Sequence, residues 1–284
     1  MDNKQIEAFI ARVKEFPTLP TIYSRLMDVM SNPRSTAHDV ADIISQDQAA
    51  ASKVLKVANS SLYGFYGKIN TISKAITYIG FDEVKNLVIA LSIFNIFSDA
   101  KKNYLMNPID LWKHSIGVAV TTRLIGKTIG VKNVENYFLA GILHQLGKLF
   151  LYKIQPDEYT KVIAYALSKQ IPVRDAEQEK LGITYTVAGE LLAEKWNLPK
   201  SIKDAIRYHY LGDTDGHNKQ MVAAIHIAKT AMIMMKIGVH ENEVVPEPNL
   251  KSWKNLELPP KFFTNNLNAI LKSYEESSMT LLSS

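Results

Sequence analysis

The chain has 284 residues and a formal net charge of +5; 46% of its residues are hydrophobic and 21% are charged. This composition is ordinary for a globular protein, and the length is enough for one large domain or two smaller ones. The absence of cysteine excludes disulfides, thiolate catalysis and zinc sites that use cysteine. No run of about 18 uncharged apolar residues occurs, and the first residues lack the pattern of a signal peptide. We therefore expect no membrane span and a cytoplasmic protein.

The positive charge does not predict a nucleic-acid partner. It comes mainly from lysine, which is interspersed with aspartate and glutamate, and arginine is scarce. Base readout and bidentate phosphate contacts favour arginine. We therefore expect no specific binding of nucleic acid.

Apolar residues recur with helical spacing along the whole chain, and no convincing strand alternation interrupts them, so we expect an all-α fold. In the N-terminal part, Thr36 followed by Asp39 is typical of a helix N-cap. Gly80 is expected to end one helix and Asp82 to cap the next. The helices expected here span residues 6–13, 22–30, 37–45, 49–58, 72–79 and 82–98.

A polar stretch at residues 98–108 is the best candidate for a domain boundary. Prolines and polar residues at 240–260 predict a loop, which is followed by one more helix and a polar tail. We therefore divide the chain into an N-terminal helical subdomain (1–100), a helical bundle (101–240) and a terminal segment (241–284). The helices expected after the boundary lie near 109–129, 133–154, 157–169, 173–181, 183–196, 199–211, 218–237 and 261–275.

The segment 139–149 reads as part of a buried helix with His144 at its centre, as in a metal site. A catalytic version of this helix would need an acid directly after the histidine. The next residue is Gln145, which is neutral and cannot supply an anionic oxygen to a divalent cation. The segment therefore predicts a helical protein that retains the shape of such a site without its chemistry.

Several motifs resemble the HDOD family over residues 6–237. In the C-terminal half they are Leu111-Trp112-Lys113-His114-Ser115, the run 140–149, the run 179–185 and Ala205-Ile206-Arg207-Tyr208-His209-Tyr210. The N-terminal half matches at Leu19-Pro20 and over 43–47, 53–60 and 75–80. HDOD proteins are relatives of the HD metal-dependent phosphohydrolases. The resemblance implies an N-terminal helical subdomain packed on a C-terminal HD-like helical bundle, and a role in bacterial signalling, usually without demonstrated catalysis.

The metal-binding positions of the HD superfamily can be transferred to this sequence one by one. The resemblance implies that the first histidine is His114 and that the His-Asp pair is His144-Gln145. Three further positions carry Tyr185, the pair His209-Tyr210 and, in place of the distal aspartate, Lys229. Three histidines are thus kept and both carboxylates are lost. We therefore predict a degenerate HD-type site with no catalytic residue, no bound metal and no cofactor.

Lys229 would oppose a metal if its side chain pointed into this site. At an effective dielectric of about 20, two unit charges about 4 Å apart repel by roughly 4 kcal/mol, and a divalent ion doubles this. We expect the ammonium to take the electrostatic place of the ion, bonded to Gln145 and to the hydroxyls of Tyr185 and Tyr210. The simpler alternative is a solvated helix lysine, with His114 and His144 as ordinary core histidines and both tyrosines as packing residues.

The leading functional hypothesis is a non-catalytic regulatory module that binds an unidentified signalling protein. The loop at 61–68 carries Tyr63, Phe65 and Tyr66, which suit either a recognition surface or an inter-subdomain contact. One alternative is a metal-dependent phosphohydrolase or phosphodiesterase that holds a divalent metal on His114, His144 and His209. Another is a pocket that binds a nucleotide or phosphate without hydrolysis through Lys148 or Lys229, although Lys148 is equally readable as a helix-surface cation. Neither the partner's identity nor the oligomeric state follows from the sequence.

Overall fold

The computed structural model describes residues 6, 9–11, 13, 15–32, 34–60, 63, 68–97, 103, 105–238, 244–245 and 247–282. The described residues form helices and no strand, so the predicted all-α fold class is confirmed. None of the described helices is long and apolar enough to cross a bilayer. The chain divides into two compact units. One, here called the bundle unit, comprises residues 1–17 and 97–262; the smaller unit comprises residues 18–96 and 263–284.

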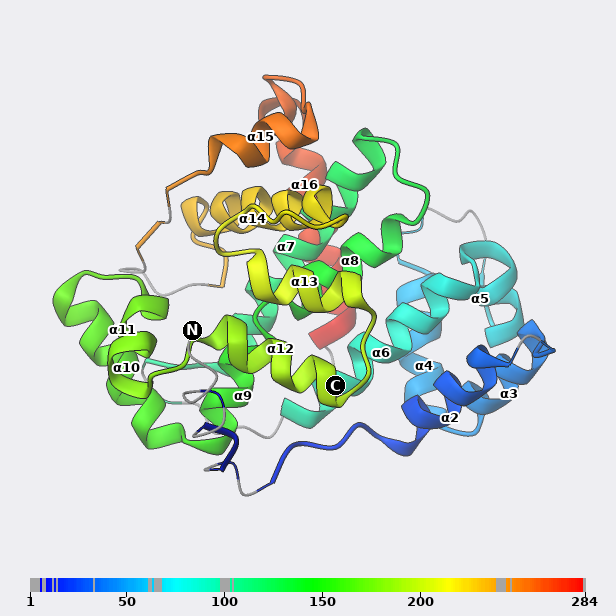
Figure 1. Cartoon of the computed structure of the whole chain (residues 1–284). Helices are drawn as coiled ribbons and strands as arrows, with labels where there is room; N and C mark the ends of the chain where they lie inside the picture. The colour runs from blue at the N-terminus through cyan, green and yellow to red at the C-terminus, as the bar shows by residue number, and fades with distance from the viewer. Residues whose placement is uncertain are drawn as a thin grey trace. The chain divides into compact units, whose positions relative to one another are not determined.

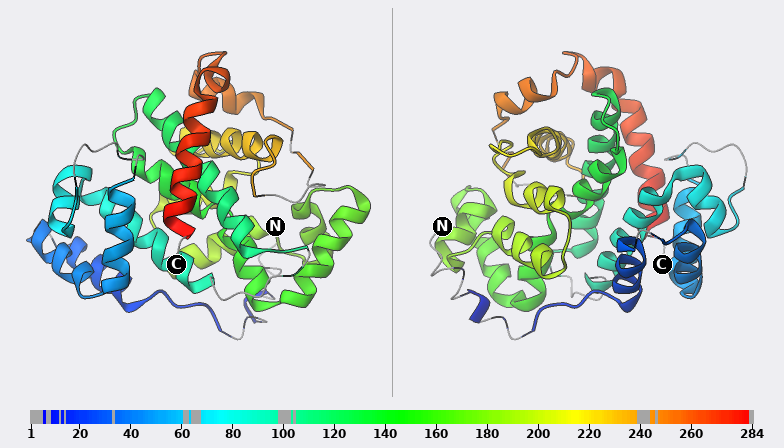
Figure 2. Two further views of the ribbon diagram at one scale, coloured as in Figure 1. Left: turned by 180° about the vertical axis from the view of Figure 1, so that it is seen from behind. Right: turned by 45° about the vertical axis from the view of Figure 1, so that its right-hand side comes forward.

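The smaller unit contains a group of short helices packed around α3. Helix α3 contacts α2, α4 and α5, and the four lie side by side in both views of Figure 2. Their apolar faces bury Leu26, Ile44, Val54 and Ala75 almost completely. The helices of this unit are α2 (Thr21–Ser31), α3 (Ala37–Ser45), α4 (Gln48–Ala58), α5 (Ile72–Ile79), α6 (Phe81–Phe97) and α16 (Phe262–Leu282).

The helix starts and ends predicted for this unit from capping residues are confirmed, with one exception. The Thr36 hydroxyl accepts from the Asp39 amide and the Asp39 carboxylate accepts from the Thr36 amide, so the predicted capping box is confirmed. Gly80 ends α5 with a φ of +100°, a conformation that favours glycine. The expectation that Asp82 caps α6 is wrong. The helix begins one residue earlier, at Phe81, and Asp82 pairs within the first turn with Lys85 at 2.8 Å.

The bundle unit is built around α7 (Pro108–Thr128). Helices α8 (Val134–Leu143) and α14 (Lys219–Met234) pack on α7, and Figure 1 shows the three together. Helix α12 (Tyr185–Lys195) packs on α9 (Leu146–Ile154) and α13 (Lys200–Tyr208). A buried ion pair at 2.5 Å between Arg123 and Glu135 joins α7 to α8. The remaining helices are α10 (Pro156–Lys169), α11 (Val173–Leu181) and α15 (Leu250–Leu256).

The single helix predicted over 133–154 is wrong, because the chain breaks at His144 and Gln145 into α8 and α9. Each half packs on a different helix. Gly141 of α8 lies against the backbone of Ala119 in α7, whereas Gly147 of α9 lies against the backbone of α12. The break places His144 at the end of α8. Hydrophobic periodicity does not reveal this break, because residues 137–152 are buried on both sides of it.

Two further differences concern the C-terminal segment. The loop expected over 240–260 contains α15, which begins after Asn249. Asn249 accepts from the Lys251 amide, and Ser252 donates to the carbonyl of Gly212 at 2.6 Å, so tertiary contacts support this short helix. The last helix does not end near 275 but continues as α16 to Leu282, with Ser277 and Leu281 buried, so the polar tail was predicted too early.

Candidate functional site

Three histidines that are distant in sequence lie together in the bundle unit. His114 comes from the middle of α7, and His144 and His209 occupy the C-cap positions of α8 and α13. The ring centroids of His114 and His144 are 5.5 Å apart, and those of His144 and His209 are 5.0 Å apart. All three side chains have an exposed fraction of 0%. The structure thus brings together the three histidines that the motif positions singled out.

The hydrogen bonds of these rings define their tautomers. The Nδ1 atom of His114 lies 3.0 Å from the carbonyl of Ile237, and that of His144 lies 2.7 Å from the carbonyl of Gly141. The Nδ1 atom of His209 lies 2.9 Å from the carbonyl of Ile206. Because a carbonyl can only accept, each Nδ1 carries the proton. Each neutral ring therefore presents the lone pair of its Nε2 atom.

Lys229 points into this group and begins a chain of hydrogen bonds. Its exposed fraction is 4%, and its ammonium donates to the hydroxyl of Tyr185 at 3.0 Å. The Tyr185 hydroxyl in turn lies 3.0 Å from Nε2 of His209, to which it donates. The reading of Lys229 as a solvated helix lysine is therefore wrong. The donors and acceptors run in one direction, from the ammonium through the phenol to the imidazole.

The other partners expected for Lys229 are placed differently. Lys229 Nζ lies 5.2 Å from the ring centroid of Tyr210, so that residue offers its aromatic face to the cation. Gln145 is buried, and its Oε1 atom has no hydrogen-bond partner among the described residues; the same holds for Nε2 of His144. Of the three oxygens expected to receive the ammonium, that of Tyr185 accepts a hydrogen bond from it.

Burial and the ammonium keep His144 and His209 neutral. The pKa of His144 lies well below its usual value because of burial, with His209, His114 and Lys229 adding unfavourable charge. Burial also holds the pKa of His209 well below the usual value, and Lys229 is the next cause. Protonation of either ring would place a second positive charge in a region shielded from water. The cluster is thus a set of neutral acceptors beside one fixed cation.

The residues present do not fit a metal ion. Across the part of the chain that the structure describes, no group of three or more histidine, aspartate or glutamate side chains is arranged to hold one. The two acid positions of the motif carry Gln145 and Lys229, and Nε2 of His209 already accepts from Tyr185. A catalytic zinc site needs about three protein ligands, and hard cations need carboxylates. The donor set satisfies neither requirement.

A second group of charges lies beside Tyr185, and sequence reasoning missed most of it. Glu177 of α11 is 0% exposed and accepts from the Tyr185 amide at 2.7 Å. Lys148 of α9 is buried with Nζ 5.2 Å from the Tyr185 ring centroid, so the reading of it as a helix-surface cation is wrong. The guanidinium of Arg174 lies 4.8 Å from the Tyr210 ring centroid. A signal for Glu177 existed, because it lies four residues from the apolar Val173 and from Leu181, on one helix face.

His226 fixes the turn that carries His209. Its Nδ1 atom donates to the carbonyl of His209 at 3.1 Å, and its Nε2 atom accepts from the amide of Asn249 at 3.0 Å. The pKa of His226 is lowered by burial, which favours the neutral ring that these two bonds require. The segment before α15 thus supports the end of α13. The sequence placed His226 on a buried helix but gave no indication of this contact.

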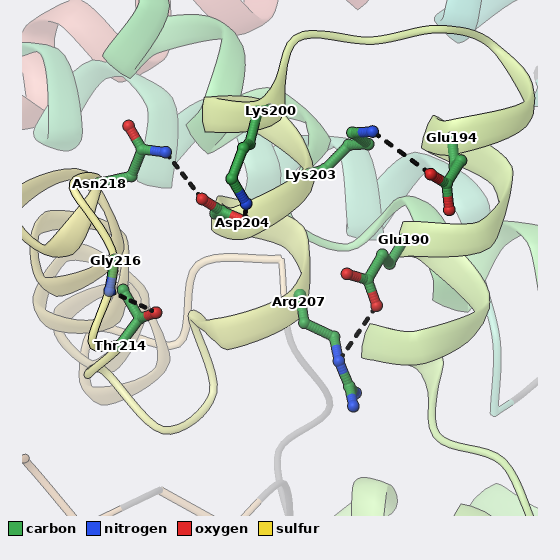
Figure 3. A network of polar contacts seen from close by, with 9 residues as sticks. All are labelled: Glu190, Glu194, Lys200, Lys203, Asp204, Arg207, Thr214, Gly216 and Asn218. Atoms are coloured by element: carbon green, nitrogen blue, oxygen red, sulfur yellow. Dashed lines mark hydrogen bonds and ion pairs between the residues drawn. The ribbon is translucent and has the colours of Figure 1, made fainter. Parts of the chain in front are cut away.

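Ion pairs hold α12 and α13 together, and these helices supply Tyr185 and His209. Figure 3 shows Arg207 of α13 paired with Glu190 of α12 at 3.1 Å, and Lys203 paired with Glu194 at 3.5 Å. Asp204 accepts from Asn218 at 2.7 Å and so connects α13 to the start of α14. These partly exposed contacts each contribute little, but together they define how the two helices face each other.

Comparison with known proteins gives a consistent family match. The HDOD domain model matches residues 16–211. A relative from Treponema pallidum (strain Nichols), an uncharacterized protein, is 24% identical over 203 residues. The match covers 70% of this chain and 38% of that protein, so the matched segment spans well under half the length of that relative.

Solved structures share the fold over nearly the whole chain. An HDOD domain protein of unknown function from Geobacter sulfurreducens has a TM-score of 0.81 and 25% identity, covering 98% of this chain and 97% of that one. A candidate signal transduction protein from Marinobacter aquaeolei VT8 has a TM-score of 0.78 and 20% identity, covering 99% and 66%. A candidate phosphohydrolase from Shewanella amazonensis SB2B has a TM-score of 0.71 and 23% identity, covering 96% and 98%. The last two likenesses establish the fold alone.

Proposed function

Because this chain belongs to the HDOD family, we propose that it is a regulatory module of bacterial signal transduction that binds a protein partner and does not hydrolyse phosphate esters. The observation that carries the proposal is the buried Lys229 ammonium, bonded to Tyr185 within the histidine cluster. A fixed cation at this place opposes a divalent ion and replaces a carboxylate ligand. We place its action in the cytoplasm.

The non-catalytic part of the proposal is tested on the purified protein. Elemental analysis for iron, manganese and zinc is combined with assays on phosphodiesters and nucleotides. We expect well below one equivalent of metal and no turnover above that of a His144→Ala variant. Near-stoichiometric metal, together with turnover that His144→Ala abolishes, would overturn it.

The partner-binding part is supported by the family resemblance and by the aromatic loop of the smaller unit. In this loop Phe65 and Tyr66 lie outside the described residues, and Tyr63 is half-buried. A photo-crosslinking amino acid at position 63, in the bacterium that makes the protein, should yield one reproducible adduct with a second protein. The same amino acid at Tyr78, which is 56% exposed on α5 of the same unit, is the matched control. Identical adducts at both positions, or none at 63, would contradict recognition by this loop.

A second candidate is an anion-binding module that does not hydrolyse its ligand. Lys148 and Lys229 are both buried and both lie within 6 Å of the Tyr185 ring centroid, at 5.2 and 5.6 Å. Two buried ammonium groups around one ring favour a negatively charged ligand. Calorimetric titration with inorganic phosphate distinguishes this candidate: binding lost in Lys148→Met supports it, and no heat at millimolar phosphate excludes simple phosphate recognition.

A further inference from the structure

We propose that Glu177 is a proton-operated latch that fastens the hairpin of α10 and α11 to the N-terminus of α12 and, through Tyr185, to the histidine cluster. The proposal goes beyond the proposed function, because it requires neither a partner nor the absence of catalysis. It concerns how one buried carboxyl group couples a separately packed element to Tyr185.

The α10–α11 hairpin has a small apolar core of its own. Val162 and Ala166 of α10 pack with Ala176 of α11, and four partly buried residues complete this cluster: Tyr165, Ile171, Val173 and Leu181. The hairpin also contacts α9 through α10. An element with its own core can move as a unit when its contacts with the rest of the fold weaken.

Glu177 uses one carboxyl oxygen to link the two helices of the hairpin and the other to join the hairpin to α12. Oε1 accepts from the Tyr159 hydroxyl of α10 at 2.6 Å, and Oε2 accepts from the amide of Tyr185 at 2.7 Å. Tyr185 is the first residue of α12, and the side chain of the N-cap residue Thr184 accepts no capping hydrogen bond from a backbone amide of the helix. Its hydroxyl instead pairs with that of Thr186 at 2.9 Å. Glu177 therefore satisfies the amide of Tyr185, one of the first-turn amides of α12 that have no acceptor within the helix.

Tyr185 transmits any change at Glu177 to the candidate site. Its amide is held by Glu177, and its carbonyl lies against Gly147 of α9, where no side chain would fit. Its hydroxyl connects Lys229 with His209. A shift of the first turn of α12 would therefore move the hydroxyl on which the hydrogen-bond chain depends.

The groups that face Glu177 partly offset the effect of burial on its pKa. Lys148 of α9 and Arg174 of α11 favour the carboxylate, as do the bonds from Tyr159 and Tyr185. Tyr210 also lies close enough to sense the charge of Glu177. Burial outweighs these effects and raises the pKa of Glu177 from 4.5 to about 7. Glu177 in these surroundings therefore gains or loses its proton near neutral pH.

The effect of pH on the latch follows from the linkage between proton binding and opening. The closed state holds the proton more tightly than an open, hydrated carboxyl group with a pKa of 4.5. Low pH therefore favours the closed latch, and opening releases the proton to solvent. Opening becomes easier as the pH rises from 4.5 through about 7 and then levels off. Between pH 5 and pH 8 the opening equilibrium should increase on the order of 50-fold.

Hydrogen exchange of the Tyr185 amide measures the latch directly. After correction for the intrinsic exchange rate, its opening equilibrium in the full chain should rise on the order of 50-fold from pH 5 to pH 8. Glu177→Gln retains an acceptor for this amide and cannot ionise. The opening equilibrium of the Tyr185 amide in this variant should therefore change little between pH 5 and pH 8. The amide of Trp196, which donates to the carbonyl of Leu192 at the other end of α12, is the internal control. A wild-type profile as flat as that of Glu177→Gln, or protection that increases with pH, overturns the proposal.

A second measurement remains informative if Glu177→Gln does not fold. Carboxyl-carbon NMR on the wild-type protein should show Glu177 titrating at about 7. Tyr159→Phe keeps the ring but removes a donor that favours the carboxylate, so the midpoint should move upward. A midpoint near 4.5 in the wild type, or no upward shift in Tyr159→Phe, would show that Glu177 is only a structural cap.

Discussion

Lys229 and Tyr185 are joined by a hydrogen bond of 3.0 Å from the ammonium nitrogen to the phenol oxygen, and both side chains are buried. The bond gives the ammonium an acceptor, and it leaves the phenol hydrogen for His209. A buried ammonium without acceptors would be strongly destabilising. The tyrosine therefore stabilises a buried lysine at the position where the HD pattern predicts a metal-ligating aspartate.

Tyr185→Phe should be much more costly than Tyr210→Phe. The first change removes an acceptor of Lys229 and the donor to His209, and buried groups that lose a hydrogen-bond partner typically cost about 3 kcal/mol in total. The second change keeps the ring that faces Lys229 and should cost less than about 1 kcal/mol. Urea unfolding of both variants at pH 7 measures the difference. Equal losses would mean that ring packing, and not the hydrogen-bond chain, is what Tyr185 contributes.

Metal affinity should return only when both lost acids are restored. Gln145→Asp alone should pair with Lys229 and remain metal-free, and Lys229→Asp alone still lacks the other carboxylate. The double variant should bind Mn²⁺ or Zn²⁺ far more tightly than the sum of the single changes predicts, because neighbouring changes are non-additive. Calorimetric titration of the wild type and the three variants decides this. Equal affinities in all four proteins would contradict the role assigned to Lys229.

Gly147→Ala should destabilise the fold more than Gly182→Ala. A β-carbon at Gly147 would overlap the Tyr185 carbonyl and approach the Gly189 amide nitrogen, so α9 and α12 would have to separate, at a cost of roughly 3 kcal/mol or more. A β-carbon at Gly182 meets open space, and the φ of +69° there costs only about 1 kcal/mol. Thermal unfolding compares the two. A smaller loss at Gly147 would show that the close approach of α9 and α12 is not required.

The sequence predicted the helical fold well because helical periodicity and caps are local. Thr36 and Asp39 define a helix start through contacts three residues apart, so the pattern alone located it. The break at His144 depends on two glycines that face different helices, and no local pattern records which helix lies opposite. The same reason explains α15, whose Ser252 and Asn249 are tied to residues near 212 and 226.

For the candidate site, motif spacing located the histidines but not the charges around them. His114, His144 and His209 were identified because the HDOD pattern fixes their positions, and the structure brings them together. The partner of Lys229 depends on side-chain direction, which spacing does not specify. Glu177 was missed because carboxylates are usually exposed. Its place on the apolar face of α11 was the available signal.

The pH dependence of stability should reveal two opposing effects between pH 5 and pH 7. The pKa values of His144 and His209 are lowered in the folded state, so their contribution is present above about 6.5 and is lost as the pH falls below it. Glu177 acts oppositely: its pKa is raised from 4.5 to about 7, so its contribution is present below 4.5 and is lost as the pH rises through about 7. The wild-type profile should therefore be shallower than the two histidines alone would produce.

Glu177→Gln removes the contribution of Glu177 and should make the free energy of unfolding depend more steeply on pH. Relative to the wild type, the free energy of unfolding of this variant should improve by about 2 kcal/mol between pH 5 and pH 8, since one pKa unit corresponds to about 1.4 kcal/mol. Glu179→Gln, on the exposed side of the same helix, controls for the loss of one negative charge and should leave the wild-type profile in place. Urea titrations at four pH values suffice. Parallel profiles for wild type and Glu177→Gln would mean that Glu177 does not take up a proton on folding, and that the histidines alone set the pH dependence.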